Sequence, residues 1–203
     1  AQGVKLNPEQ VKNVENTSYM FFNCGNLENL DVKLWDVGNV KNFSYMFYEC
    51  RALEDLNLDN LNTSIVTDFN MLFYNCKALK KLDVSMLNTS SATNFRSIFA
   101  GCESLEYLDA SNFITTGVSN IFYAFYDCPK LKYLDISSWN LSSVDTSSNQ
   151  NYKDAFTSTS NLLLLKTPKV VPSSLNGLIG IPTMKDSSGN DQHNLPVTNS
   201  SIT

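Results

Sequence analysis

Residues 68–93 read DFNMLFYNCKALKKLDVSMLNTSSAT, and this unit recurs along most of the chain. Five cysteines mark the period, because each lies 26 residues after the one before it. They are Cys24, Cys50, Cys76, Cys102 and Cys128. A phenylalanine always stands three residues before the cysteine, and leucines stand three and six residues after it. Self-similarity at a fixed period of about 20–50 residues is typical of proteins built from stacked repeats.

Each repeat divides into two predicted elements. In the unit quoted above, Phe69, Leu72 and Phe73 follow the spacing i, i+3 and i+4, which is typical of one face of a short amphipathic helix. An Asn or Asp in front of this segment predicts a side-chain cap for its backbone N–H groups. The cap residues are Asn16, Asn42, Asp68, Asn94 and Asn120. After the cysteine, Leu82 and Val84 alternate with polar residues, which predicts a half-buried strand.

No repeat can fold alone, because the apolar side chains of one coil cannot offset the entropy lost in ordering it, so neighbouring repeats must share a core. We predict an α/β fold, a right-handed leucine-rich-repeat solenoid with a parallel β-sheet on one face and short helices on the other. Residues 1–167 form this solenoid: a partial N-terminal coil that includes residues 4–6, five full repeats and a degenerate sixth coil. In the sixth coil Phe156 takes the phenylalanine position and Thr159 replaces the cysteine. Residues 168–203, richer in Pro and Gly, are predicted to form a C-terminal cap and linker.

The composition excludes several classes of function. The chain has 203 residues and a formal net charge of −5, whereas a nucleic-acid partner requires a clustered basic face. No stretch approaches the ~20 apolar residues of a membrane span, and the first ten residues lack the basic and apolar regions of a signal peptide. The only histidine, His193, lies in a polar segment, so we predict no catalytic residues, no metal site and no cofactor.

The repeat resembles the 26-residue surface repeats of the BspA-type leucine-rich repeat proteins of bacteria. The residues that carry the resemblance are Phe43–Cys50, Leu53, Leu56–Leu58, Asn62–Ser64 and Val66 in one repeat, and Leu165–Pro168, Ile181–Pro182, Asp186, Gly189–Asn190 and Leu195–Pro196 near the C-terminus. The resemblance implies an extracellular, surface-attached, non-enzymatic protein, and some relatives are adhesins for host matrix glycoproteins. These motifs are specific for the repeat class but not for a ligand, and they leave the mode of anchoring open.

The cysteine column allows three interpretations. Stacked coils would place neighbouring cysteines about 5 Å apart, close enough for a disulfide, but five is an odd number and a ladder of parallel side chains presents poor disulfide geometry. No histidine is near enough to activate a thiol, and stacked thiols cannot surround a metal ion tetrahedrally. We favour buried, reduced thiols that pack as small hydrophobes, with an adventitious disulfide or a reactive thiol as the alternatives.

The outward positions of the predicted strands form the candidate ligand-binding surface. Two columns should lie side by side on it, one seven and the other five residues after each cysteine. The candidate site residues are Asp31, Asn57, Asp83, Asp109 and Asp135 in the first column, and Asp55, Lys81, Tyr107 and Tyr133 in the second. The acidic column is either a binding stripe for basic or cation-bridged ligands or, as we favour, a set of side chains that bond the loop backbone in every repeat. Tyr107 and Tyr133 differ from the rest of their column and indicate a local contact patch.

Other large side chains are assigned to packing. Trp35 and Trp139 occupy a column that is otherwise filled by leucine or phenylalanine, so we expect both in the core. The aromatic column two residues before the cysteine is expected to pack at the edge of the core. It consists of Phe22, Tyr48, Tyr74 and Tyr126.

Together these patterns predict a binding module rather than an enzyme. The most specific hypothesis is a bacterial surface adhesin domain, extracellular, surface-attached and monomeric, which contacts a host extracellular protein or glycoprotein through its strand face without inserting into the membrane. Two alternatives remain open. One is a carbohydrate-binding module in which Tyr107 and Tyr133 flank a groove, and the other is a passive stalk that spaces a neighbouring domain.

Overall fold

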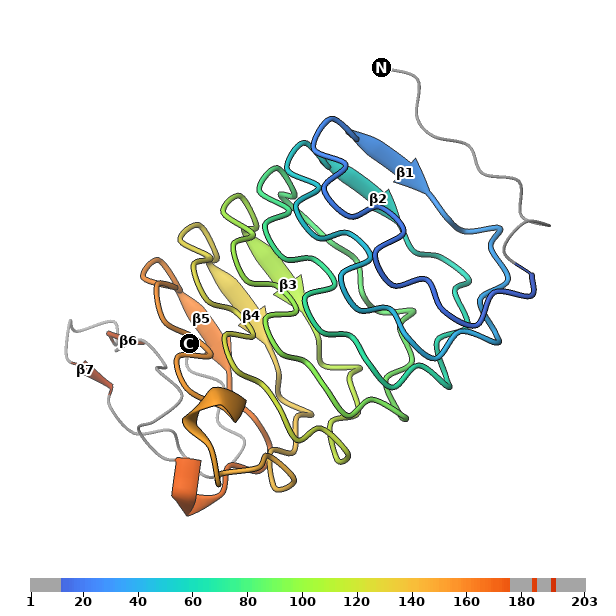
Figure 1. The fold of residues 1–203 in the computed structure, drawn as a ribbon. Coiled ribbons are helices and arrows are strands. Elements are labelled where there is room, and N and C mark those ends of the chain that lie inside the picture. The colour runs from blue at the N-terminus through green and yellow to red at the C-terminus, as the bar shows by residue number, and fades with distance from the viewer. Residues whose placement is uncertain (1–11, 176–183, 186–190, 193–203) are drawn as a thin grey trace.

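Short strands align on one face of a stack of coils (Figure 1). The computed structural model describes residues 12–175, 184–185 and 191–192. The strands of this face are β1 (Asn29–Asp31), β2 (Asp55–Asn57), β3 (Tyr107–Asp109), β4 (Tyr133–Asp135) and β5 (Leu164–Lys166). The middle residue of each is a buried leucine, and in β1 to β4 both of its neighbours are more polar, so the predicted strand alternation is confirmed there.

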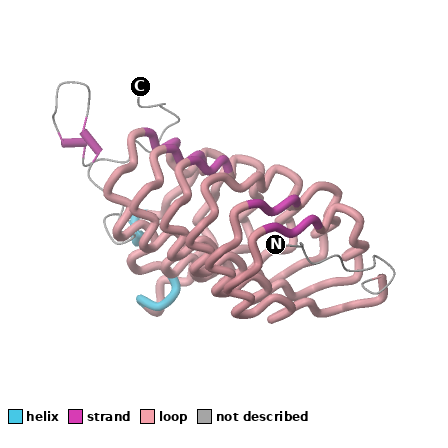
Figure 2. The backbone as a smooth tube through the Cα atoms, turned by 90° about the horizontal axis from the view of Figure 1, so that it is seen from above, coloured by secondary structure: helices cyan, strands magenta, loops and turns pink. Residues whose placement is uncertain are grey.

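Strand pairing is parallel and follows the repeat. Asn29 of β1 pairs with Asp55 of β2, and Tyr107 of β3 pairs with Tyr133 of β4, in each case one 26-residue period later. The third repeat contributes only an isolated bridge between Lys81 and Tyr107. The strand face is therefore divided into two sheet segments, β1–β2 and β3–β4–β5 (Figure 2).

The prediction of a short helix before each cysteine is wrong. Among the described residues these segments are successive tight turns, and two residues in each turn segment have a positive φ, such as Tyr45 at 59° and Glu49 at 61°. Successive backbone N–H groups alternate between a hydrogen bond within the turn and a hydrogen bond to the next coil. The N–H of Met46 donates within the turn to Phe43 (3.2 Å), and that of Phe47 donates to Leu72 of the next coil (3.0 Å). Bonds between coils thus replace half of the bonds that a helix would make within itself.

The predicted caps of these segments keep their role, although the segment they cap is a turn. In each of the five repeats the side-chain Oδ1 accepts from the backbone N–H two residues later, at 2.8–3.0 Å. This short-range bond is the Asx-turn geometry that Asn and Asp favour. The accepting residues are Asn16, Asn42, Asp68, Asn94 and Asn120.

A continuous stack of phenylalanine rings runs through the core and crosses every coil. Ring centroids of successive members lie 5.2–5.7 Å apart. The stack consists of Phe21, Phe47, Phe73, Phe99, Phe125 and Phe156. Trp35 and Trp139 are buried as predicted, and Nε1 of Trp139 donates to the carbonyl of Ala110 at 3.0 Å. The shared core shows why single repeats depend on their neighbours.

The sixth coil is shifted in register but continues the stack. The 3-10 helix η2 (Asn149–Asn151) lies in the segment where the extra residues enter. A second 3-10 helix, η3 (Ser173–Leu175), follows, and Leu175 is fully buried. Val170 forms a bridge with Asn140, so residues 168–175 pack directly on the last coils. The short pair β6 (Met184–Lys185) and β7 (Asp191–Gln192) is antiparallel.

The N-terminal end of the predicted solenoid and most of the predicted C-terminal linker lie outside the described residues. The partial coil at residues 4–6 and most of the predicted linker, 176–203, belong to this part of the chain. The boundary after residue 167 therefore stays a prediction. Val14, also in register with the repeats, packs against the core.

Candidate ligand-binding site on the strand face

The side chains of the acidic column accept hydrogen bonds from the backbone. In every repeat the Oδ1 atom seven residues after the cysteine accepts from the N–H two residues further on, at 2.8–3.0 Å. The five accepting residues are Asp31, Asn57, Asp83, Asp109 and Asp135. The favoured structural interpretation of this column is therefore confirmed. Each aspartate keeps a second carboxylate oxygen for other partners.

The aspartates at the two ends of the column form ion pairs. Oδ2 of Asp31 lies 3.3 Å from Nζ of Lys33. Asp135 is 3% exposed, and its Oδ2 is 2.8 Å from Nζ of Lys166 and accepts from the hydroxyl of Tyr133 at 3.2 Å. Burial alone would raise the pKa of Asp135, but hydrogen bonds from Lys166 and Ser137 outweigh burial and hold this pKa below its ordinary value. Asp135 is thus a buried anchor for β5 rather than a free carboxylate.

Asp83 and Asp109, in the middle of the column, make no ion pair with any residue that the structure describes. Hydrogen bonds from Ser85 hold the pKa of Asp83 below its ordinary value, so this carboxylate is charged at neutral pH. The middle of the strand face therefore carries two carboxylates without an ion pair, with Lys81 beside them at the same pocket.

The second column changes from charged to aromatic residues along the stack. Lys81 pairs with Tyr107, and Tyr107 pairs with Tyr133. The two tyrosine rings are stacked, with centroids 4.4 Å apart and planes 5° apart. Tyr107 is 45% exposed, whereas Tyr133 is half-buried.

A pocket of about 390 Å³ lies between the third and fourth repeats, where the isolated Lys81–Tyr107 bridge pairs the two chain segments. It is lined by Lys81, Leu82, Asp83, Ser85, Tyr107, Asp109, Ser111 and Asn112. Four of the nine predicted site residues therefore meet in one place. The other five do not line this pocket: Asp31, Asp55, Asn57, Tyr133 and Asp135.

Three polar residues of the pocket were missed by the sequence reasoning. The backbone N–H groups of Ser85 and Ser111 donate hydrogen bonds to Asp83 and Asp109, respectively. Nδ2 of Asn112 reaches back to the preceding coil and donates to the carbonyls of Val84, Ser85 and Leu87 at 3.0–3.1 Å. Serine in equivalent positions of two successive repeats was the available signal, whereas nothing in the sequence indicated the contacts of Asn112.

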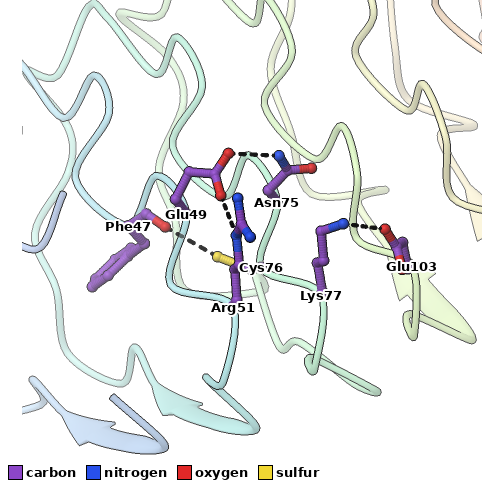
Figure 3. Close-up of polar contacts among 7 residues, drawn as sticks. All are labelled: Phe47, Glu49, Arg51, Asn75, Cys76, Lys77 and Glu103. Carbon is purple, nitrogen blue, oxygen red and sulfur yellow. Dashed lines mark hydrogen bonds and ion pairs between the residues drawn. The ribbon is translucent and has the colours of Figure 1, made fainter. Parts of the chain in front are cut away.

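Four of the five cysteines are buried and reduced, as favoured. Cys50, Cys76, Cys102 and Cys128 each donate a weak S–H hydrogen bond to the phenylalanine carbonyl of the preceding coil, at 3.2–3.3 Å. Figure 3 shows this contact between Cys76 and Phe47. Burial raises the pKa of all four thiols, to about 12 in Cys50 and Cys128. Cys24 differs, because it is free and exposed.

This difference predicts selective alkylation. A maleimide added to the folded protein at about pH 8 should modify Cys24 alone, because thiolates are the reactive form and the other four thiols are buried with raised pKa values. Intact-mass spectrometry should record one adduct before denaturation and five after it. The Cys24→Ser variant should remain unmodified while folded. A second adduct on the folded wild type would contradict this account of the cysteine column.

Polar side chains link neighbouring coils beside the cysteine column (Figure 3). Glu49 forms an ion pair with Arg51 and accepts a hydrogen bond from Nδ2 of Asn75 at 2.8 Å. Nζ of Lys77 lies 2.5 Å from Oε1 of Glu103 in the next coil. The Glu49–Asn75 and Lys77–Glu103 contacts each connect two coils, whereas the Glu49–Arg51 pair lies within one.

The described residues contain neither a metal-ligand cluster nor a membrane-spanning helix. They contain no group of three or more His, Cys, Asp or Glu side chains arranged to hold a metal ion. In the same part of the chain, no helix has both the length and the apolar character needed to cross a bilayer. The pocket itself presents carboxylates, hydroxyls, one amide, one ammonium group and one exposed aromatic ring.

The repeats match a known family model. The model is described as "Mycoplasma protein of unknown function, DUF285", and it matches residues 4–81 and 51–163. The chain belongs to this family. The two matches overlap, and together they include strands β1 to β4 and the pocket of this DUF285 protein.

Solved structures give weaker similarities. A leucine-rich cell surface protein from Faecalibacterium prausnitzii A2-165 is 16% identical, with a TM-score of 0.37, and the match covers 81% of this chain and 48% of that one. A leucine-rich repeat protein from Bacteroides ovatus ATCC 8483 is 15% identical, with a TM-score of 0.29 and coverages of 83% and 51%. The DUF285 chain thus spans about half the length of these proteins. No curated protein matches the chain.

Proposed function

We propose that the chain is a non-enzymatic binding module that is exposed on the outside of a bacterial cell and contacts a host glycoprotein through its strand face. The observation that carries the proposal is the pocket, which gathers Lys81, Asp83, Tyr107 and Asp109 at the middle of this face. A rigid stack of coils holds these side chains in place, and recognition surfaces commonly consist of such exposed side chains on a rigid scaffold.

The finer structural class belongs to the same proposal. We propose that the coils form a right-handed leucine-rich-repeat solenoid of the BspA type, which acts as a monomer and is attached to the cell surface. Parallel pairing in register and the shared phenylalanine stack support a repeat protein whose coils follow one another along an axis.

Two other functions remain as alternatives. The stacked tyrosines beside the pocket favour a carbohydrate-binding module, because an exposed aromatic face is suited to a sugar ring. A passive stalk would need no pocket on the strand face. The binding experiment below separates the stalk from the other two.

We expect the purified 203-residue chain to bind at least one host matrix or plasma glycoprotein saturably in surface plasmon resonance. Replacing Tyr107 and Tyr133 with serine should weaken that binding by about tenfold or more, because the aromatic contact area at the pocket is lost. Binding to enzymatically deglycosylated proteins, measured in parallel, reports whether the protein or the glycan is recognised.

A second pair of tyrosines supplies the matched control. Tyr19 and Tyr45 are also stacked, with centroids 4.7 Å apart, but they lie in the turn segments before the cysteines instead of on the strand face. Their double serine variant should bind as the wild type does. Equal losses in both variants, or no saturable binding of any glycoprotein at micromolar concentration, would contradict the proposal; the second result would favour the stalk.

A further inference from the structure

Tyr107 presents one free aromatic face to the pocket. Its other face is covered by Tyr133, whose ring is nearly parallel to it at 4.4 Å. The pocket is lined by Tyr107 and Lys81 but not by Tyr133, so it lies on the side of the ring that faces the preceding coil. Because Tyr107 is 45% exposed, the stack holds a flat apolar surface open at the wall of the pocket.

Most of the polar atoms around this ring face are hydrogen-bond acceptors. Asp83 and Asp109 each use one carboxylate oxygen for the backbone and keep the second. Nδ2 of Asn112 is occupied by three carbonyls, so its remaining polar atom is the acceptor Oδ1. A complementary ligand must combine several donors with one flat apolar face.

We propose that this pocket binds a neutral pyranose ring, stacked on the free face of Tyr107. The inference rests on the proposed function, since the sugar is then the recognised part of the host glycoprotein. The C–H face of the ring packs on Tyr107, while its hydroxyls donate to Asp83, Asp109 and Asn112. The volume of about 390 Å³ is within the range of small-molecule sites, about 300–1,000 Å³.

The charges at the pocket favour a neutral sugar over charged ligands. The carboxylates of Asp83 and Asp109 repel sialic acids, uronic acids and sulfated sugars. Lys81 lines the same pocket and offsets part of this negative charge, which weakens the attraction of the pocket for an arginine or lysine side chain of a protein partner. A neutral ring meets both signs of charge without repulsion.

The test is saturation-transfer NMR on the full chain with single sugars. The neutral probes are the methyl pyranosides of glucose, galactose, mannose, N-acetylglucosamine and N-acetylgalactosamine. N-acetylneuraminic acid is the anionic probe, and N-acetylarginine amide is the cationic one. We expect at least one neutral pyranoside to bind saturably, and neither charged probe to bind.

Three variants link that binding to the ring. Tyr107→Phe keeps the aromatic face and should retain more of the binding than a variant without the ring. Tyr107→Leu keeps apolar bulk without the flat ring and should weaken binding about tenfold. Tyr19→Leu, at an exposed tyrosine outside the strand face, should have no effect.

The results also separate this inference from the proposed function. Absence of neutral-sugar binding, undiminished binding in Tyr107→Leu, or binding of the arginine probe alone overturns the inference. If deglycosylated proteins nevertheless bind through Tyr107 and Tyr133, the proposed function stands without it. If a pyranoside binds through Tyr107 but no glycoprotein binds, the inference stands as a carbohydrate-binding module and the adhesin proposal fails.

Discussion

Replacing Phe99 by alanine is expected to lower the free energy of unfolding by about 3–5 kcal/mol. Phe99 is fully buried, and its ring is stacked between Phe73 and Phe125 with centroids 5.6 Å from each. Truncation leaves a cavity between three coils and removes apolar contacts on both sides. Urea unfolding followed by circular dichroism measures the change.

The position of Phe99 in the stack makes its loss especially costly. Each coil depends on its neighbours for a core, so weakening the centre of the array weakens two interfaces at once. Phe22 supplies the control, because it is 43% exposed and stacks with Tyr48 outside the buried phenylalanine stack. Phe22→Ala should cost less than about 1 kcal/mol. Similar losses in the two variants would show that the phenylalanine stack does not hold the coils together.

The sequence predicted the core and the strand face because both depend on which residues recur. Leucines such as Leu108 alternate with polar residues, and this alternation alone decides which side of a strand is buried. The turn segments could not be predicted in the same way. The spacing of Phe69, Leu72 and Phe73 is compatible with a helix and with four-residue turns, and what decides between them is the neighbouring coil. Bonds such as Phe73 N–H to the carbonyl of Ile98 connect residues 25 positions apart and leave no local pattern.

The candidate site was predictable only in part for a similar reason. Lys81 and Tyr107 were placed together by the period, which fixes their register. The ion pair between Asp135 and Lys166 was not predictable, because Lys166 comes from the sixth coil. The register of that coil is shifted by the inserted residues near η2. The contacts of Asn112 with the preceding coil lie within the regular period, but asparagine does not recur at this position in the repeats on either side. The contact of Lys166 was hidden for a different reason. Contacts formed across a change of register cannot be read from the repeat itself.

A column of buried threonines gives a second large expected effect. Oγ1 of Thr89 donates to the carbonyl of Ile114 at 3.1 Å and accepts from the N–H of the same residue at 2.7 Å. Thr63 and Thr115 make the same pair of bonds to Asn88 and Asn140 in their next coils. Each hydroxyl therefore satisfies both backbone groups of one residue where the chain enters the turn that follows.

Thr89→Val should lower the free energy of unfolding by about 2–3 kcal/mol, because valine fits the same space but leaves the N–H and carbonyl of Ile114 without their partner. Thr93→Val is the matched control. Thr93 is exposed, and its hydroxyl makes one bond, to the carbonyl of Thr67 at 3.1 Å, which water can replace, so its loss should cost less than about 0.5 kcal/mol. Thr89→Ser restores the hydroxyl and should recover most of the loss measured by urea unfolding. If serine is no better than valine at position 89, the methyl group rather than the hydroxyl accounts for the threonine, and the bonds to Ile114 add nothing to stability.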